Sequence, residues 1–106
     1  MVRFIETYLF TEDIEHELSL DEYRQLQLAL LFRPAQGAVI QGSGGLRKMR
    51  WRRPGMGKRG GLRVIYYWEA RSETFYMLTI YRKAARDDLT HEQTAILRRL
   101  VKEEFK

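Results

Sequence analysis

Residues 62–69 have the sequence Leu-Arg-Val-Ile-Tyr-Tyr-Trp-Glu, and residues 75–83 have the sequence Phe-Tyr-Met-Leu-Thr-Ile-Tyr-Arg-Lys. Both stretches are rich in β-branched and aromatic residues and are almost continuously apolar, as expected of central strands that are covered on both faces. The intervening residues 70–74 are few enough to form a hairpin turn. These two stretches therefore predict an antiparallel hairpin at the centre of a sheet.

Further strands are predicted on the N-terminal side of this hairpin. Residues 46–52 alternate in character, so that Lys48 and Arg50 leave the same face of a strand. Residues 2–10 are rich in β-forming side chains and predict a first strand. Residues 34–45, which begin with proline and end in a glycine-rich run, predict a loop.

Helices are predicted on both sides of the strands. The acidic segment 11–17 is compatible with a short helix or a turn. Ser-Leu-Asp-Glu at 19–22 fits the capping box of a helix start, and it precedes an apolar helical pattern that predicts a helix over 20–33, ending before Pro34. Thr-His-Glu-Gln at 90–93 repeats the capping pattern and begins a C-terminal amphipathic helix.

The predicted order is β-α-α-β-β-β-α, an α+β fold with a mainly antiparallel sheet. With 106 residues we expect one domain over 1–106, because the chain is too short for two cores. A hydrophobic content of 44% excludes a disordered chain, and the absence of cysteine excludes disulfides and cysteine-based zinc sites. Neither a signal peptide nor an apolar run of about 20 residues is visible, which predicts a soluble cytoplasmic protein.

The positive charge is concentrated in the middle of the chain. The net charge is +5, yet residues 46–63 hold eight basic residues and no acidic one, while residues 1–45 are net negative. Such an uneven distribution of charge favours a polyanionic partner. Composition alone leaves open whether this partner is a nucleic acid, an acidic protein or an anionic membrane surface.

Cofactor and metal chemistry are poorly supported. Residues 55–60 match G-x-G-x-x-G, but they join two strands, and Lys58 is not followed by the Ser or Thr of a phosphate-binding loop. His16 and His91 are not in a metal-ligand spacing. The adjacent carboxylates at 87–88 precede a helix, which favours a solvated or capping role. We therefore predict no cofactor and no metal site.

What remains is a set of cations on neighbouring strands. Lys48 and Arg50 share a face, Arg63 lies near the start of the next strand, and Lys83 ends the strand after that. In an antiparallel meander these four charges can converge, although Arg63 is expected to be a surface charge. A cationic cleft suits phosphoryl chemistry, where negative charge develops on phosphate oxygens. The same cleft can also bind RNA without cutting it.

Three motifs make the chain resemble a known family. They are Gly-Gly-Leu-Arg-Lys-Met-Arg at 44–50, Gly-Lys-Arg-Gly-Gly-Leu-Arg-Val-Ile-Tyr-Tyr at 57–67 and Leu-Thr-Ile-Tyr-Arg-Lys at 78–83. Together with the order of elements they resemble the RelE/HigB toxins of bacterial type II toxin–antitoxin systems (the RelE/ParE superfamily). The Gly-Lys-Arg-Gly-Gly loop is most similar to the HigB branch.

The resemblance implies a compact antiparallel sheet with helices on one side and a cationic groove on the other. It also implies a ribosome-dependent, metal-independent endoribonuclease, or mRNA interferase, that cleaves mRNA in the A site by 2′-hydroxyl attack and so inhibits translation. The implied partners are a cognate helix-turn-helix antitoxin, the 70S ribosome (the 30S A site with its 16S rRNA) and mRNA, with no membrane.

Residue roles carry over from the same resemblance. Lys48 is the candidate for activating the 2′-hydroxyl, Arg50 for holding phosphate, and Arg63 for stabilising the pentacoordinate phosphate. Lys83 is expected to contact phosphate or to protonate the leaving oxygen. The catalytic residues are thus Lys48, Arg63 and Lys83. Leu89 stands where RelE has a tyrosine, which leaves the general base open.

Further RNA or phosphate contacts are expected from the basic residues around these positions: Arg47, Arg52, Arg53, Lys58, Arg59 and Arg82. Two other functions remain open on the same fold. One is a gyrase-poisoning toxin of the ParE type, which generally lacks the converging basic set. The other is a non-catalytic module that binds RNA or protein.

Overall fold

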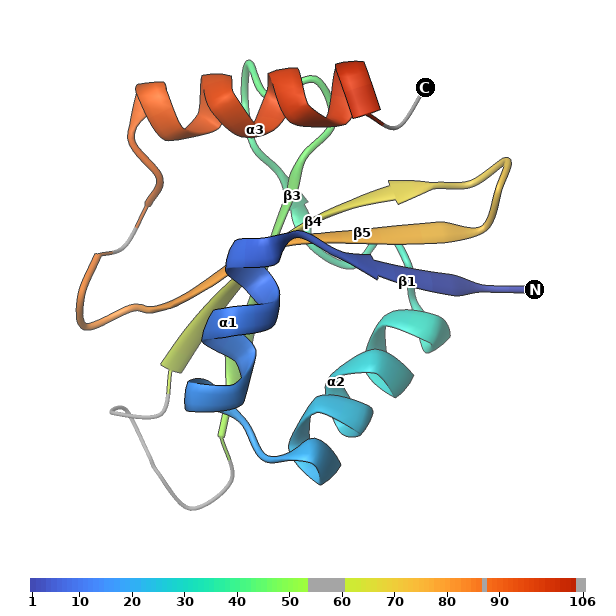
Figure 1. Ribbon diagram of the computed structural model, residues 1–106, viewed down its shortest axis with the longest axis vertical. Helices are drawn as coiled ribbons and strands as arrows, with labels where there is room; N and C mark the ends of the chain where they lie inside the picture. Colours follow the sequence, from blue (N-terminus) through green and yellow to red (C-terminus); the bar gives the residue numbers. More distant parts are fainter. Residues whose placement is uncertain (54–60, 87, 105–106) are drawn as a thin grey trace.

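The computed structural model describes residues 1–53, 61–86 and 88–104. Within these ranges five strands form one sheet in the spatial order β1-β5-β4-β3-β2 (Figure 1). β1 is parallel to β5, and all other neighbouring strands are antiparallel. The strands are β1 (Arg3–Glu6), β2 (Ala38–Val39), β3 (Arg47–Arg52), β4 (Gly61–Glu69) and β5 (Thr74–Arg82). The predicted α+β class with a mainly antiparallel sheet is confirmed.

In the described ranges three helices cover the sheet from both sides. They are α1 (Tyr8–Glu17), α2 (Leu20–Phe32) and α3 (His91–Glu104). α1 and α2 pack on one face in a first core, and α3 packs on the other face in a second core (Figure 1). The expectation that all helices lie on one side is therefore wrong, because the apolar stripe of α3 needs a face that α1 and α2 have not already covered.

The first strand is shorter than predicted. β1 ends at Glu6, and Thr7 caps α1 by accepting a hydrogen bond on its hydroxyl oxygen from the Phe10 N–H at 3.1 Å. The same hydroxyl donates to the carbonyl of Leu78 at 2.7 Å, which ties the helix start to β5. The cap outweighs the β-forming character of residues 8–10, and it buries Phe10 completely.

The predicted helix starts are confirmed in detail. Ser19 and Glu22 form the reciprocal capping box of α2, which ends at Phe32. At α3 the Thr90 hydroxyl accepts from the Gln93 N–H at 3.0 Å, and the Gln93 side chain accepts from the Thr90 N–H at 2.9 Å. Each pair satisfies two amides that the helix leaves unpaired at its start.

The central hairpin supplies both cores with alternate residues. Val64 and Tyr66 of β4 point into the first core, and Ile65 points into the second. Pairing steps from Ile65↔Thr79 to Tyr66↔Met77, so that Leu78 is an extra residue, a β-bulge. Because both faces of β5 are buried, alternate residues supply both cores, which explains the nearly continuous apolar sequence.

The predicted loop 34–45 contains the short strand β2, with Ala38 opposite Lys48 of β3. The hydroxyl of buried Tyr66 donates to the carbonyl of Pro34 at 2.8 Å and accepts from the N–H of Gly37 at 2.9 Å. A Cβ atom at Gly37 would lie 2.9 Å from the Tyr66 ring, so only glycine permits this approach. These contacts place β2 beside β3.

Candidate active site

The basic residues of β3 are divided between the two faces of the sheet. Lys48 pairs with Ile65 of the second core, and Arg50 pairs with Arg63 of β4, so these three cations share the face on which α3 packs. Arg52 follows by alternation and is exposed. We call Lys48, Arg50, Arg52 and Arg63 the cationic face. Three of the four cations predicted to converge, Lys48, Arg50 and Arg63, thus share one face of the sheet, and their convergence with Lys83 in one site stays a prediction.

Arg63 is the most unusual member of this face. It is the third residue of β4 and only 4% exposed, not the surface charge expected from its place in the sequence. Arginine is rarely buried so deeply, and two like charges directly opposite each other weaken a sheet. Because Arg63 stands directly opposite Arg50, the arrangement does not favour stability. Such an exception to the packing rules is typical of a functional site.

A carboxylate lies at the edge of the cationic face. Asp88, between β5 and α3, accepts a hydrogen bond from the Lys48 ammonium in an ion pair. That hydrogen bond, the charge of Lys48 and the charge of Arg63 hold the pKa of Asp88 below its ordinary value. Asp88 is therefore ionised at neutral pH. The sequence predicted a solvated or capping carboxylate, whereas the structure pairs Asp88 with Lys48 and uses Thr90 as the cap.

The same connecting segment brings a further cation. Tyr81 of β5 stands opposite Arg63 and is 6% exposed. The guanidinium carbon of Arg86 lies 5.1 Å from the centroid of the Tyr81 ring, within cation–π range. Sequence reasoning missed both Arg86 and Asp88, because residues in an irregular segment have no periodicity that predicts where they point.

The remaining basic residue of β3, Arg47, is on the face of the first core. Arg47 pairs with Tyr66, and its Nη1 donates to the carbonyls of Gly37 at 2.7 Å and Ala35 at 3.1 Å. Arg47 thereby ties β3 to the segment that leads into β2. Its side chain is engaged on the opposite face from Lys48.

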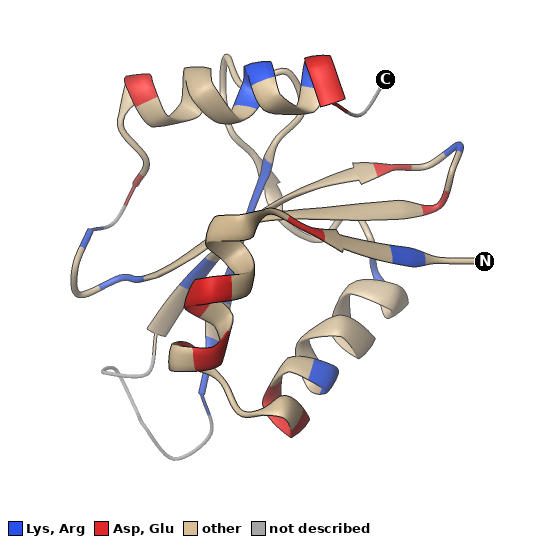
Figure 2. Cartoon of the chain, viewed as in Figure 1, with Lys and Arg blue, Asp and Glu red and all other residues tan. Residues whose placement is uncertain are grey.

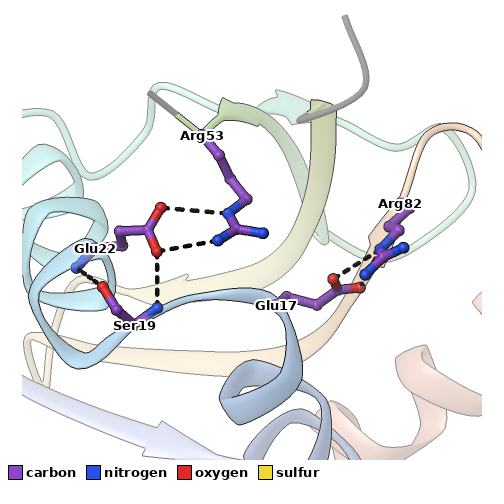
Figure 3. A network of polar contacts seen from close by, with 5 residues as sticks. All are labelled: Glu17, Ser19, Glu22, Arg53 and Arg82. Atoms are coloured by element: carbon purple, nitrogen blue, oxygen red, sulfur yellow. Dashed lines mark hydrogen bonds and ion pairs between the residues drawn. The ribbon is translucent and has the colours of Figure 1, made fainter. Parts of the chain in front are cut away.

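Two further arginines bind acidic residues of the N-terminal helices (Figure 3). Arg53 contacts Glu22 at the start of α2 with N···O distances of 3.3 and 3.4 Å. Arg82 contacts Glu17 at the end of α1 with distances of 2.8 and 3.1 Å. Figure 2 shows the acidic residues on α1 and at the start of α2, and the basic residues along β3. These ion pairs give Arg53 and Arg82 structural partners away from the cationic face.

Of the remaining predicted residues, the structure describes Lys83, which lies beyond the end of β5. Lys83 is exposed one residue beyond β5, and its backbone N–H donates to the carbonyl of Gly61 at 3.1 Å. This places Lys83 two positions beyond the Arg63–Tyr81 pair. Lys58 and Arg59 lie outside the described residues.

Among the residues that the structure describes, no three or more His, Cys, Asp or Glu side chains gather as a metal site. His16 is in the last turn of α1, and His91 is the first residue of α3. None of the described helices combines the length and apolar character needed to cross a membrane.

Comparison with known proteins identifies the family. Residues 32–106 match the model of the RelE toxin of the RelE/RelB toxin–antitoxin system, a range that includes the whole cationic face. The chain belongs to the RelE toxin family. The RelE assignment predicted from the sequence is confirmed, and the HigB branch stays a prediction.

Solved RelE structures share the fold. An arginine-to-alanine double mutant of Escherichia coli toxin RelE in the free state matches with a TM-score of 0.62 and 12% identity, covering 91% of this chain and 96% of that chain. The archaeal RelE–RelB complex from Pyrococcus horikoshii OT3 matches with a TM-score of 0.52 and 19% identity, covering 77% of this chain and 94% of that chain. At these identities the two RelE structures show the fold alone.

Proposed function

We propose that this RelE-family toxin is an endoribonuclease that cleaves mRNA on the ribosome and so inhibits translation. The observation that carries this proposal is the placement of Lys48, Arg50 and Arg63 on one face, with Arg63 buried directly opposite Arg50. A buried arginine with further cations on the same face is suited to stabilising charge on a phosphate in a transition state.

In the proposed reaction the RNA 2′-oxygen attacks the adjacent phosphorus. A new P–O2′ bond forms as the 2′-hydroxyl releases its proton to water, the P–O5′ bond breaks, and the leaving 5′-oxygen takes up a proton, so the products carry a 2′,3′-cyclic phosphate and a 5′-hydroxyl. The nucleophile belongs to the substrate, so the protein contributes positioning and charge stabilisation. No metal or cofactor is required by this route.

Each cation has a role in this scheme. Arg63 and Arg50 bind the non-bridging oxygens as the phosphorus becomes pentacoordinate. Lys48 stabilises the negative charge that develops when the 2′-hydroxyl loses its proton. Its ion pair with Asp88 fixes where that ammonium lies. Lys83, exposed beyond β5, is assigned to a phosphate contact or to the leaving oxygen.

The proposal includes two partners. RelE is described with RelB in the matched family model and in the archaeal complex, and we propose a helix-turn-helix antitoxin for this chain as well. The second partner is the ribosome, with 16S rRNA and A-site mRNA as the polyanions that the positive middle segment attracts.

The test is primer extension on mRNA in a purified translation system, with and without ribosomes. The expected result is cleavage only on translating ribosomes, with cyclic-phosphate ends and no sensitivity to EDTA added to the isolated protein before assay. Cleavage of naked RNA would remove the ribosome from the mechanism. Absence of cleavage together with inhibition of gyrase supercoiling would replace the nuclease with a gyrase poison, and absence of both would favour a binding module.

A further inference from the structure

A hollow of about 680 Å³ lies between α3 and the end of the sheet that carries the β4–β5 turn. Four cations from β1, that turn and α3 line it: Arg3, Arg71, Arg98 and Lys102. Figure 2 shows basic segments at these three places, on β1, at the tip of the turn and on the later turns of α3. Among the described residues that line the hollow, Glu69 alone is acidic. The hollow is therefore positive, and its volume is within the roughly 300–1,000 Å³ of small-molecule sites.

The four cations are not neutralised by carboxylates. Within residues 1–53, 61–86 and 88–104, none of the four forms an ion pair. Arg3 Nη2 donates to the Thr74 hydroxyl at 3.4 Å, and Arg98 Nη1 donates to the carbonyl of Gly42 at 3.3 Å, so both guanidinium groups bind neutral acceptors. Cations gathered around one concave surface in this way attract a ligand that carries several negative charges.

The loop before β3 fixes where Arg98 lies. Gly44 has a φ of +75°, and a Cβ atom there would lie 3.2 Å from Arg98 Nε. Glycine therefore suits both the backbone conformation and the close approach of the guanidinium. Because these contacts already hold the Arg98 side chain, it loses less conformational freedom when a ligand binds.

Two tyrosines add aromatic surface to the same lining. Tyr67 is half-buried and Tyr76 is 7% exposed, and their ring centroids lie 6.3 Å apart. A Cβ atom at Gly45 would lie 3.2 Å from the Tyr67 ring, so the loop packs closely against it. The flat apolar surface is thus formed before any ligand arrives. Aromatic surface beside cations suits a ligand with both a planar ring and phosphates.

The hollow is separate from the cationic face, although both are on the α3 side of the sheet. Tyr67 lies four residues beyond Arg63 in β4, about 13 Å along the strand. Ile65, midway between them, is completely buried in the second core, to which α3 contributes Leu97 and Val101. Because α3 covers the strand between the two sites, the arrangement favours a separate small ligand over one continuous RNA strand.

A neighbouring hollow of about 720 Å³ shares Arg98 and Lys102. Arg99 lines that hollow and not the smaller one. No Tyr, Trp or Phe is among the described residues that line it. The smaller hollow is therefore distinguished by its two tyrosine rings, and Arg99 provides a matched control for Arg98.

We propose that the hollow at Tyr67 and Arg98 binds a nucleoside polyphosphate, with its phosphates on the four cations and its base against the tyrosine surface. The inference goes beyond the proposed cleavage of mRNA and does not depend on it. Several phosphates match the number of cations, and guanidinium groups bind phosphate through paired hydrogen bonds. The base matches the aromatic part of the lining, since every base has a flat π-face.

The site is tested by calorimetric titration of the intact protein with ATP in the absence of divalent cations. Tripolyphosphate is the control for the phosphates, and adenosine is the control for the base. Tripolyphosphate is expected to bind at least about fivefold more weakly than ATP, the lower end of what one stacked base contributes. Adenosine should also bind more weakly, because it lacks the charges. Equal affinities for ATP and tripolyphosphate, or no binding of ATP, would overturn the site.

A pair of variants locates the binding. Arg98→Ala and Arg99→Ala each remove one positive charge from an exposed residue of α3. Arg98→Ala is expected to weaken ATP binding by at least about tenfold, the lower end of what a hydrogen bond to a charged group contributes. Arg99→Ala should weaken it by less than about twofold, because charges outside the site are screened by salt. Equal losses in the two variants would overturn the site.

A last variant separates this site from the nuclease. Lys48→Ala/Arg50→Ala should leave the affinity for ATP unchanged, and loss of ATP binding there, with Arg98→Ala unaffected, would move the ligand to the cationic face and overturn the proposal. Binding of ATP that depends on Arg98 in a protein that does not cleave mRNA would retain the site and reject the nuclease. Cleavage of mRNA by a protein that does not bind ATP would do the reverse.

Discussion

Arg47 and Lys48 are neighbours in β3, yet they belong to different regions of the molecule. Arg47 is on the face of α1 and α2, where its guanidinium bonds the carbonyls of Ala35 and Gly37. Lys48 is on the face of α3, beside Arg50 and Arg63, and its ammonium pairs with Asp88. The same contrast separates Arg82, bound to Glu17, from Tyr81, which stands opposite Arg63.

Strand alternation puts Arg47 on the opposite face of the sheet from Lys48 and Arg50, the cations proposed to bind RNA. On the side of α1 and α2, each of Arg47, Arg53 and Arg82 binds an oxygen of another segment of the chain. On the cationic face Lys48 pairs with Asp88, but Arg50 stands directly opposite another cation, Arg63. Composition alone cannot tell which basic residues lie on which face of the sheet, because neighbouring residues of a strand point to opposite faces.

The largest expected effect is on the cationic face. Arg63→Ala should lower the rate of mRNA cleavage by about 100- to 1,000-fold, the typical loss when one donor to a developing oxyanion is removed. The measurement is single-turnover cleavage on translating ribosomes.

Because Arg63 is buried, the matched control is Arg63→Lys, which keeps a positive charge on this residue of β4 but lacks the planar guanidinium. Partial recovery of cleavage in Arg63→Lys, with circular dichroism unchanged in both variants, would locate the effect in the chemistry. Full activity in Arg63→Ala would remove Arg63 from the site.

The neighbours Arg47 and Lys48 should differ in how much each contributes to the stability of the fold. Arg47→Ala should reduce the free energy of unfolding by about 1–3 kcal/mol, since it removes charged hydrogen bonds to two carbonyls, while Lys48→Ala should change it by less than about 0.5 kcal/mol. Urea unfolding of the two variants measures both values. A larger loss in Lys48→Ala than in Arg47→Ala would contradict the assignment of faces.

A smaller effect is expected for the ion pair of Arg82. Arg82→Ala should cost below about 1 kcal/mol of stability, because half-exposed ion pairs contribute little. The affinity of Arg82→Ala for RNA should fall only slightly, as expected from the loss of one positive charge anywhere on the protein. Glu17→Gln is the control, because it breaks the same ion pair but makes the protein more positive. A loss of RNA affinity in Arg82→Ala as large as that in Arg50→Ala would place Arg82 in the interface after all.

The smallest effect concerns acid pH. Lys48 and Arg63 hold the pKa of Asp88 in the folded protein below its ordinary value. The Asp88–Lys48 pair therefore stabilises the fold at pH values above the pKa of Asp88 in the unfolded chain, about 3.9. This stabilisation is lost as the pH falls through the lower pKa of the folded protein. The difference in stability between wild type and Asp88→Asn should therefore vanish in strong acid. An NMR titration should also show the pKa of Asp88 rising towards its ordinary value in Lys48→Ala, and no rise would contradict the pairing.

Much of this architecture could be predicted because it is encoded locally. The apolar runs around Val64 and Leu78 predict the central hairpin, and the capping boxes at Ser19 and Thr90 predict two helix starts. The alternation of β3 placed Lys48 and Arg50 on one face, and pairing with β4 added Arg63.

The rest depends on contacts between distant residues. Residues 8–10 alone predict a strand. In the structure Thr7 caps α1, and its hydroxyl is held in place by a hydrogen bond to Leu78 of β5, a contact that the local sequence does not indicate. Burial of Arg63 follows from the packing around β4, and the position of Asp88 follows from the path of an irregular segment. The partners of Arg53 and Arg82 lie on α1 and α2, so pattern alone could not remove these arginines from the candidate interface.

The most direct measurement compares the two faces in one assay. Lys48→Ala/Arg50→Ala and Arg47→Ala/Arg82→Ala each remove two positive charges, so their net charges are equal. With both proteins folded at the assay temperature, primer extension on translating ribosomes should show cleavage lost in the first variant and retained in the second. Equal loss in both variants would mean that RNA responds to charge alone, and loss only in the second would place the active site on the other face.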